Sequence, residues 1–142
     1  MKATQPSLEN IDNFNTIPFY SQSVAAGFPS PADDFLEFDL SLDKKLIKHP
    51  SATFFVRVSG TSMINAKIFD GSILLVDKAE KIKNDDIVLA VIDGCFTVKR
   101  YRKVGDSVFL YPENKLLRPI KIVEGSESYI WGKVMWSFNR VG

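Results

Sequence analysis

Residues 87–100 read Ile87-Val88-Leu89-Ala90-Val91-Ile92-Asp93-Gly94-Cys95-Phe96-Thr97-Val98-Lys99-Arg100. Two runs rich in strand-forming residues flank Asp93-Gly94, and an Asp-Gly pair in that position is the strongest short signal for a β-hairpin. The stretch therefore predicts two antiparallel strands joined by a two-residue turn. Side chains alternate along a strand, so Thr97 and Lys99 share one face of the second run.

Further strand patterns lie on both sides of this hairpin. They cover Thr53–Val58, Ile73–Val76, Ser107–Tyr111, Ile120–Val123 and Tyr129–Phe138, with Gly and Pro residues between several of them. The segment Ser62–Phe69 is compatible with a short helix, and Ser41 is placed to begin another helix that ends before Pro50. We therefore predict a mainly β domain with one or two short helices over residues 41–142.

The residues before this domain have a different composition. Pro6, Pro18, Pro29 and Pro31 lie among many Ser and Asn residues, and periodic apolar positions are few. This composition is typical of an extended segment rather than a packed element. We therefore predict a flexible N-terminal arm over residues 1–40.

The overall composition excludes several classes of protein. A length of 142 residues is sufficient for one domain with its own core, and a net charge of +1 gives no general attraction to nucleic acid or membranes. No apolar segment is long enough to cross a bilayer, and the N-terminus lacks a secretory signal. A single cysteine, Cys95, excludes an internal disulfide. We expect a cytoplasmic protein.

The sequence offers little that could hold a metal or cofactor. One cysteine and one histidine, His49, exclude zinc sites of the Cys/His type. Asp33-Asp34 and Asp85-Asp86 are typical of turns, and no Gly-rich phosphate-binding loop is present. We therefore expect no metal and no cofactor, and we expect His49 to be a surface residue.

Ser62 and Lys99 are the candidates for catalysis. A serine needs a base in order to attack a carbonyl group, and a desolvated lysine can serve in place of histidine. Ser62 follows a tight turn at Gly60-Thr61, and the amides there could stabilise a developing oxyanion. Burial would lower the pKa of a lysine, and Thr97 is placed to hold the free amine.

A simpler interpretation of each residue stays open. Lys99 could begin a solvated basic strand edge that continues to Lys103, and Ser62 could be an ordinary turn residue. Ser41-Leu42-Asp43-Lys44 matches the Ser-x-x-Lys pattern of penicillin-binding enzymes, but the motifs that accompany it there are missing, so we interpret it as the start of a helix. Spacing alone does not decide between these interpretations.

Several motifs that follow one another in a specific order carry more information. They are Ala26-Gly27-Phe28-Pro29-Ser30-Pro31-Ala32, His49-Pro50-Ser51-Ala52-Thr53, Ser59-Gly60-Thr61-Ser62-Met63, Asp70-Gly71-Ser72-Ile73-Leu74-Leu75-Val76-Asp77 and Asp93 to Arg100. Together they resemble the UmuD-like branch of the LexA-type self-cleaving serine peptidases, which act in the bacterial DNA-damage (SOS) response. The resemblance begins near Ala25 and implies a LexA/UmuD-type peptidase domain of short, coiled β-sheets.

This resemblance implies a role for each matching position. Ser62 would be the nucleophile of a serine endopeptidase that cleaves itself, and Lys99 would be its general base. The scissile bond would be Ala26–Gly27, within the predicted arm. The residues that would support the site or its oxyanion are Thr61, Met63 and Thr97.

The resemblance also implies partners. In this family the RecA filament on single-stranded DNA stimulates cleavage, and the product, here Gly27–Gly142, would join a UmuC-type Y-family DNA polymerase as a homodimer in translesion synthesis. Only about forty residues precede the β-region and they show no helix-turn-helix pattern, so we do not expect sequence-specific DNA binding. Two alternatives stay open, namely a non-catalytic module that binds the polymerase or RecA, and a truncated phage-type repressor.

Overall fold

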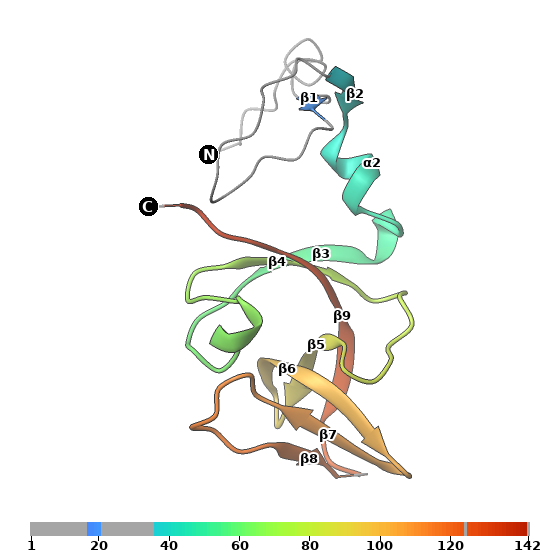
Figure 1. The fold of residues 1–142 in the computed structure, drawn as a ribbon. Coiled ribbons are helices and arrows are strands. Elements are labelled where there is room, and N and C mark those ends of the chain that lie inside the picture. The colour runs from blue at the N-terminus through green and yellow to red at the C-terminus, as the bar shows by residue number, and fades with distance from the viewer. Residues whose placement is uncertain (1–16, 21–35, 124, 142) are drawn as a thin grey trace, which may run out of the picture. The chain divides into compact units, whose positions relative to one another are not determined.

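The computed structural model describes residues 17–20, 36–123 and 125–141 (Figure 1). The chain divides into two compact units, Met1–Lys48 and His49–Gly142. In the first unit, strands β1 (Ile17–Tyr20) and β2 (Leu36–Leu40) pair in antiparallel fashion. The sequence analysis missed this pair, because a long connection between two short strands gives no hairpin signal.

Helix α2 (Leu42–Leu46) follows β2, as predicted. Ser41 occupies the N-cap position and its carbonyl accepts a hydrogen bond from the amide of Lys45 at 3.0 Å, but its side chain makes no capping hydrogen bond. Among the described residues, no helix has the length and apolar character needed to cross a membrane. The division into an arm, residues 1–40, and a peptidase domain, residues 41–142, stays a prediction.

An antiparallel sheet forms most of the second unit (Figure 1). The strand order in its described part is β3–β4–β9–β5–β6–β7–β8. The strands are β3 (Thr53–Arg57), β4 (Ile73–Asp77), β5 (Ile87–Ile92), β6 (Cys95–Val104), β7 (Ser107–Tyr111), β8 (Ile120–Ile122) and β9 (Tyr129–Phe138), with 3₁₀ turns η1 (Pro50–Ala52) and η2 (Ile64–Ala66). The prediction of a mainly β fold with short helices is confirmed.

The predicted hairpin joins β5 to β6. Asp93 and Gly94 have φ angles of 48° and 80°, both in the left-handed region that a tight two-residue hairpin turn requires. Strand β6 continues beyond the predicted run as far as Val104 and lies between β5 and β7. Lys99 is therefore in the interior of a strand that has neighbours on both sides.

Strand β9 is the last in sequence but lies in the middle of the sheet, between β4 and β5. Its Gly132 is buried, and a Cβ atom there would lie 2.7 Å from Val76 Cγ1 and 3.1 Å from the carbonyl oxygen of Asp77. The pairing of β4 with β9 also shifts register between Leu75 and Val76. The absence of a side chain at Gly132 therefore allows β4 and β9 to approach closely.

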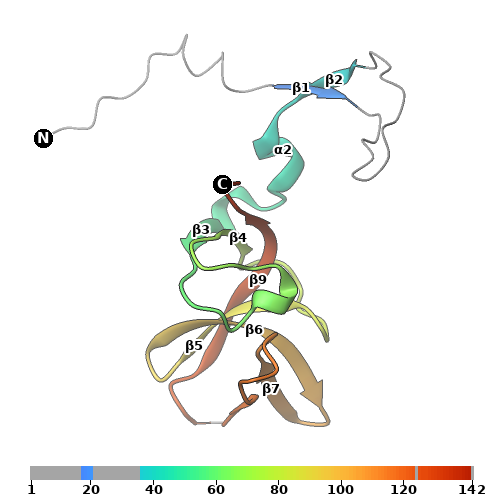
Figure 2. The same ribbon diagram turned by 60° about the vertical axis from the view of Figure 1, so that its left-hand side comes forward.

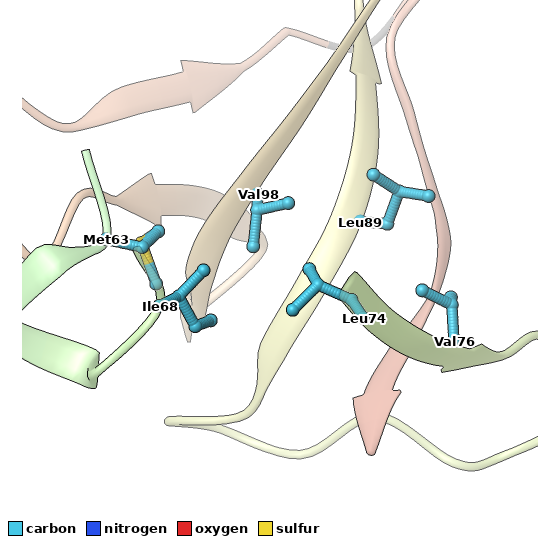
Figure 3. Close-up of a cluster of buried hydrophobic side chains, with 6 residues drawn as sticks. All are labelled: Met63, Ile68, Leu74, Val76, Leu89 and Val98. Carbon is cyan, nitrogen blue, oxygen red and sulfur yellow. The ribbon is translucent and has the colours of Figure 1, made fainter. Parts of the chain in front are cut away.

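The segment between β3 and β4 is the green part of the ribbon in Figure 2. A cluster of buried apolar side chains connects this segment to the sheet (Figure 3). Met63 and Ile68 come from this segment, and both are only 2% exposed. The members of the cluster are Met63, Ile68, Leu74, Val76, Leu89 and Val98. Because burial of a large apolar side chain contributes about 1.5–3 kcal/mol, Met63 fixes the turn next to Ser62.

Replacing Gly132 with alanine should lower the free energy of unfolding by about 1–3 kcal/mol, because the added methyl group overlaps Val76. Urea unfolding would measure the change. The matched control is Ser137→Ala on the same strand, where a buried hydroxyl has no hydrogen-bond partner among the described residues, so its removal should not destabilise the fold. Equal stability of the two variants would contradict this account of β9.

Candidate active site

The structure brings Ser62 and Lys99 together. Lys99 Nζ lies 3.0 Å from Ser62 Oγ, although Ser62 is in the segment between β3 and β4 and Lys99 is on β6. Lys99 is only 8% exposed and Ser62 is half-buried. The interpretation of Lys99 as part of a solvated strand edge is therefore wrong.

The amine of Lys99 has two further partners. It lies 2.7 Å from Thr97 Oγ1 and 3.1 Å from the carbonyl oxygen of Val98. A neutral amine has two N–H groups and one lone pair, and the carbonyl of Val98 can only accept a hydrogen bond. All three contacts are satisfied if the amine donates to Val98 and Thr97 and accepts the hydroxyl proton of Ser62.

Burial lowers the pKa of Lys99 because the ammonium form loses its hydration. Among the described residues, Lys99 forms no ion pair with a carboxylate. A neighbouring negative charge would favour the ammonium form and oppose the effect of burial. The environment of Lys99 consists instead of hydroxyl and carbonyl oxygens, which can hold a neutral amine in place.

The segment that carries Ser62 is closed by hydrogen bonds where it leaves β3 and where it enters β4. The amide of Val58 donates to the carbonyl of Ser72 at 2.8 Å, and the amide of Gly71 donates to the carbonyl of Val58 at 2.7 Å. The amide of Gly60 donates to Asp70 Oδ1 at 2.9 Å. These bonds give the turn a defined position above the core that Met63 anchors.

The other predicted site residues have different surroundings. Thr97 touches the lysine amine, whereas Met63 contributes a core side chain. The carbonyl of Thr61 accepts hydrogen bonds from the amide of Ile64 and from Asn114 Nδ2, both at 3.2 Å. Sequence reasoning assigned no role to Asn114.

The backbone amides near Ser62 are available for a ligand. Within the described part of the chain, the backbone amides of Ser62 and Met63 donate no hydrogen bond. The short helix predicted over Ser62–Phe69 is present only as the 3₁₀ turn Ile64–Ala66. Two amides that precede this turn could therefore donate to an oxyanion near Ser62 Oγ.

A shallow pocket of about 120 Å³ opens beside Ser62. Phe96 forms part of its wall, is 61% exposed, and stacks on Trp131 with 5.1 Å between the ring centroids. The lining residues are Val58, Ser59, Ser62, Leu89, Phe96, Thr97 and Val98. The predicted cleavage site, Ala26 and Gly27, lies outside the described residues, so a cut at that bond stays a prediction.

His49 makes a contact that the sequence analysis missed. Its Nδ1 lies 2.6 Å from Oδ2 of Asp77, whose side chain is only 2% exposed. Burial raises the pKa of Asp77, but hydrogen bonds from His49 and from the amides of Ala79 and Glu80 outweigh this effect and lower the pKa overall. The side chain of His49 is thus partly exposed, in agreement with the prediction of a surface residue. Its ring also contacts Asp77, the last residue of β4.

In the described ranges, the group that could hold a metal ion is His49, Asp77 and Glu80, whose ligand atoms lie within 4.8 Å of one another. Asp77 already accepts hydrogen bonds from His49 and from the amides of Ala79 and Glu80. These contacts explain the arrangement without an ion. The expectation that the protein holds no metal and no cofactor stays a prediction.

Comparison with known proteins places the chain in a family. The family model described as Peptidase S24-like matches residues 18–135. The chain belongs to the Peptidase S24-like family. This is a serine peptidase family with autoproteolysis, so the prediction of a LexA-type peptidase domain is confirmed at the level of the family.

Relatives in this family cover most of the chain. MucA of Salmonella typhimurium is 43% identical over 124 residues, which are 87% of this chain and 84% of MucA. ImpA of Shigella flexneri is 44% identical over 121 residues, 78% of this chain and 83% of ImpA. LexA repressor 2 of Geobacter sulfurreducens is 41% identical over 119 residues, 83% of this chain and 58% of that repressor.

Replacing Lys99 with methionine should stabilise the fold at neutral pH, because the variant avoids burying an amine. The pKa of Lys99 is lower in the folded than in the unfolded chain. At a pH between these two pKa values, the unfolded chain therefore binds more protons than the folded chain. The contribution of Lys99 to the wild-type free energy of unfolding therefore rises with pH, up to the ordinary lysine pKa of about 10.4. The difference in free energy of unfolding that favours Lys99→Met should shrink over the same pH range.

Urea unfolding of both proteins between pH 7 and pH 10.5 would measure this difference. Lys103→Met is the matched control, because it makes the same replacement at an exposed position of the same strand. A constant difference for Lys99→Met would contradict a buried lysine with a lowered pKa.

Proposed function

We propose that this protein is a serine endopeptidase that cleaves itself once, between Ala26 and Gly27. Ser62 is the nucleophile and Lys99 is the general base. The observation that carries this proposal is the 3.0 Å contact between Ser62 Oγ and the buried amine of Lys99. Membership of the Peptidase S24-like family supports it independently.

In the first step the hydroxyl proton of Ser62 passes to the neutral amine of Lys99 as Oγ attacks the carbonyl carbon of Ala26. The amides of Ser62 and Met63 donate to the oxygen that becomes negative, and Thr61 supports this turn through its carbonyl. Thr97 holds the amine during the transfer.

In the second step the tetrahedral intermediate breaks the bond to Gly27. The Lys99 ammonium returns its proton to the departing nitrogen, which becomes the amino terminus of Gly27–Gly142, and Ser62 retains Ala26 as an ester. Water then attacks this ester while Lys99 accepts one of its protons, and the Lys99 ammonium passes that proton to Ser62 Oγ as the ester bond breaks. The products are a segment that ends in the Ala26 carboxylate and a free Ser62 hydroxyl.

The residues at the proposed cleavage site suit this chemistry. Ala26 has a small side chain and Gly27 has none, so the backbone on both sides of the bond can approach Ser62 closely. The pocket beside Ser62 has limited volume, which favours a small side chain at the cut. An extended arm would supply its own segment as the substrate.

The relatives and the sequence motifs support a cellular role as well. We place the protein in the SOS response, where the RecA filament on single-stranded DNA stimulates cleavage and the shortened product acts as a homodimer with a UmuC-type Y-family DNA polymerase in translesion synthesis. The similarity to MucA and ImpA supports this assignment. We place these events in the cytoplasm, without sequence-specific DNA binding.

A non-catalytic binding module explains the structure less well. Burying a lysine without a counter-charge destabilises a fold, and a docking surface gains nothing from an amine that is 8% exposed. Two oxygen atoms hold that amine beside a hydroxyl group. This arrangement has a clear use in proton transfer, so it favours the peptidase.

Ser62→Ala should abolish the fragment that begins at Gly27, and Lys99→Ala should slow its formation by about 10²–10⁴-fold, the usual contribution of a general base. Intact mass spectrometry after incubation with RecA, nucleotide and single-stranded DNA would measure both. Ser107→Ala and Lys103→Ala, outside the site, are the matched controls and should cleave normally. The mechanism is wrong if Ser62→Ala still yields the fragment.

Spontaneous cleavage without RecA should become faster as the pH rises, because the neutral fraction of Lys99 grows. Since burial lowers the pKa of Lys99, the rate should level off below the ordinary lysine pKa of about 10.4. A series of incubations between pH 6 and pH 10.5, followed by intact mass, would give the profile. A rate that is independent of pH would argue against a lysine base.

A further inference from the structure

The loop between β7 and β8, residues 112–119, contacts the Ser62 turn on both sides of the nucleophile. Asn114 Nδ2 donates to the carbonyl of Thr61 at 3.2 Å, and the amide of Asn65 donates to the carbonyl of Glu113 at 2.9 Å. Thr61 immediately precedes Ser62, and Asn65 lies in the turn that follows it. Two adjacent loop residues therefore hold the turn before and after Ser62.

The orientation of the Asn114 side chain is fixed by its other contact. Oδ1 of Asn114 accepts the amide of Leu116 at 3.1 Å, and the Asn114 carbonyl accepts the amide of Leu117 at 3.0 Å. If the side-chain oxygen and nitrogen were exchanged, the NH₂ group would face the amide N–H of Leu116, and the oxygen would face the carbonyl oxygen of Thr61. Neither pair could form a hydrogen bond. The amide nitrogen must therefore face Thr61.

The same loop is connected to the strand that carries Lys99. Arg100 follows Lys99 on β6, and its side chain forms an ion pair with Glu113 and donates to the carbonyl of Asp85. Arg100 also pairs with Tyr111, the last residue of β7 before the loop. The Glu113-Asn114 pair thus connects the turn of the nucleophile to the strand of the base.

We propose that Asn114 is a positioning residue that keeps Ser62 Oγ within reach of Lys99 Nζ by holding the carbonyl of Thr61. The carbonyl of Thr61 and the amide of Ser62 belong to one planar peptide group and point in opposite directions. A hydrogen bond to the carbonyl of Thr61 therefore fixes the orientation of the peptide group between Thr61 and Ser62. It also directs the amide N–H of Ser62 away from Asn114. This inference rests on the proposed function.

Asn114→Asp is the sharpest test. The aspartate keeps the oxygen that accepts from Leu116, but it places a second oxygen, in place of the donor, against the carbonyl of Thr61. Asn84→Asp is the matched control, because Asn84 accepts from the amide of Lys103 and donates to its carbonyl on a different loop. Both variants add the same negative charge and lose one donor.

We expect Asn114→Asp to cleave itself about 10-fold to 100-fold more slowly, since a misplacement of about 1 Å can have an effect of that size, and Asn84→Asp to cleave at the wild-type rate. The midpoint of the pH profile should move to higher pH in Asn114→Ala, which adds no charge near Lys99, because the neutral Lys99 amine loses the hydroxyl of Ser62 as a donor. A merely structural role would lower the thermal midpoint without moving the pH profile.

A second readout separates this proposal from the proposed function. A fluorophosphonate probe, which phosphonylates Ser62 with loss of fluoride, reports the reactivity of the serine even if the chain does not cut itself. If wild type does not self-cleave but its Lys99-dependent phosphonylation by the probe is slower in Asn114→Asp, the self-cleavage proposal fails and the positioning role stands.

The positioning role is overturned if Asn114→Asp retains the wild-type rates of cleavage and phosphonylation, or if Asn114→Ala loses activity equally at every pH. If Asn114→Asp does not fold, Asn114→Ala removes the same donor without adding charge, and the same outcomes apply to it.

Discussion

The burial of the Lys99 amine without a carboxylate partner among the described residues is the constraint around which the site is organised. Removing an amine from water destabilises the fold unless the group is neutral and hydrogen-bonded. The described structure supplies Thr97, Val98 and Ser62 as partners and no carboxylate. The environment that makes Lys99 unfavourable as a cation therefore suits its proposed role as a base for the hydroxyl beside it.

The fold meets this constraint with a stable frame and a separately anchored turn. The hairpin of β5 and β6 sets the register that places Thr97 two residues before Lys99 on one face. The turn of Ser62 is attached to this frame by Met63 in the core, by its closing hydrogen bonds and by the loop that contains Asn114. The proposed nucleophile and the proposed base thus come from distant parts of the chain.

Local sequence patterns predicted the β-hairpin and the position of Thr97 beside Lys99. Asp93-Gly94 indicated the hairpin because its turn geometry depends on those two residues alone, and alternation placed Thr97 beside Lys99. The contact between Asn114 and Thr61, and that between His49 and Asp77, join residues far apart in sequence, so no local pattern could indicate them. The meeting of Ser62 with Lys99 is equally long-range, and only the order of motifs pointed to it.

Titration of Lys99 itself tests the central claim most directly. Lysine labelled with ¹³C at the ε-methylene gives one NMR signal for each residue, and the signal that is missing from Lys99→Arg belongs to Lys99. Our account predicts that this signal titrates below the ordinary lysine pKa of about 10.4, because burial lowers the pKa of Lys99. A Lys99 signal that titrates at that ordinary value or above it would contradict the account.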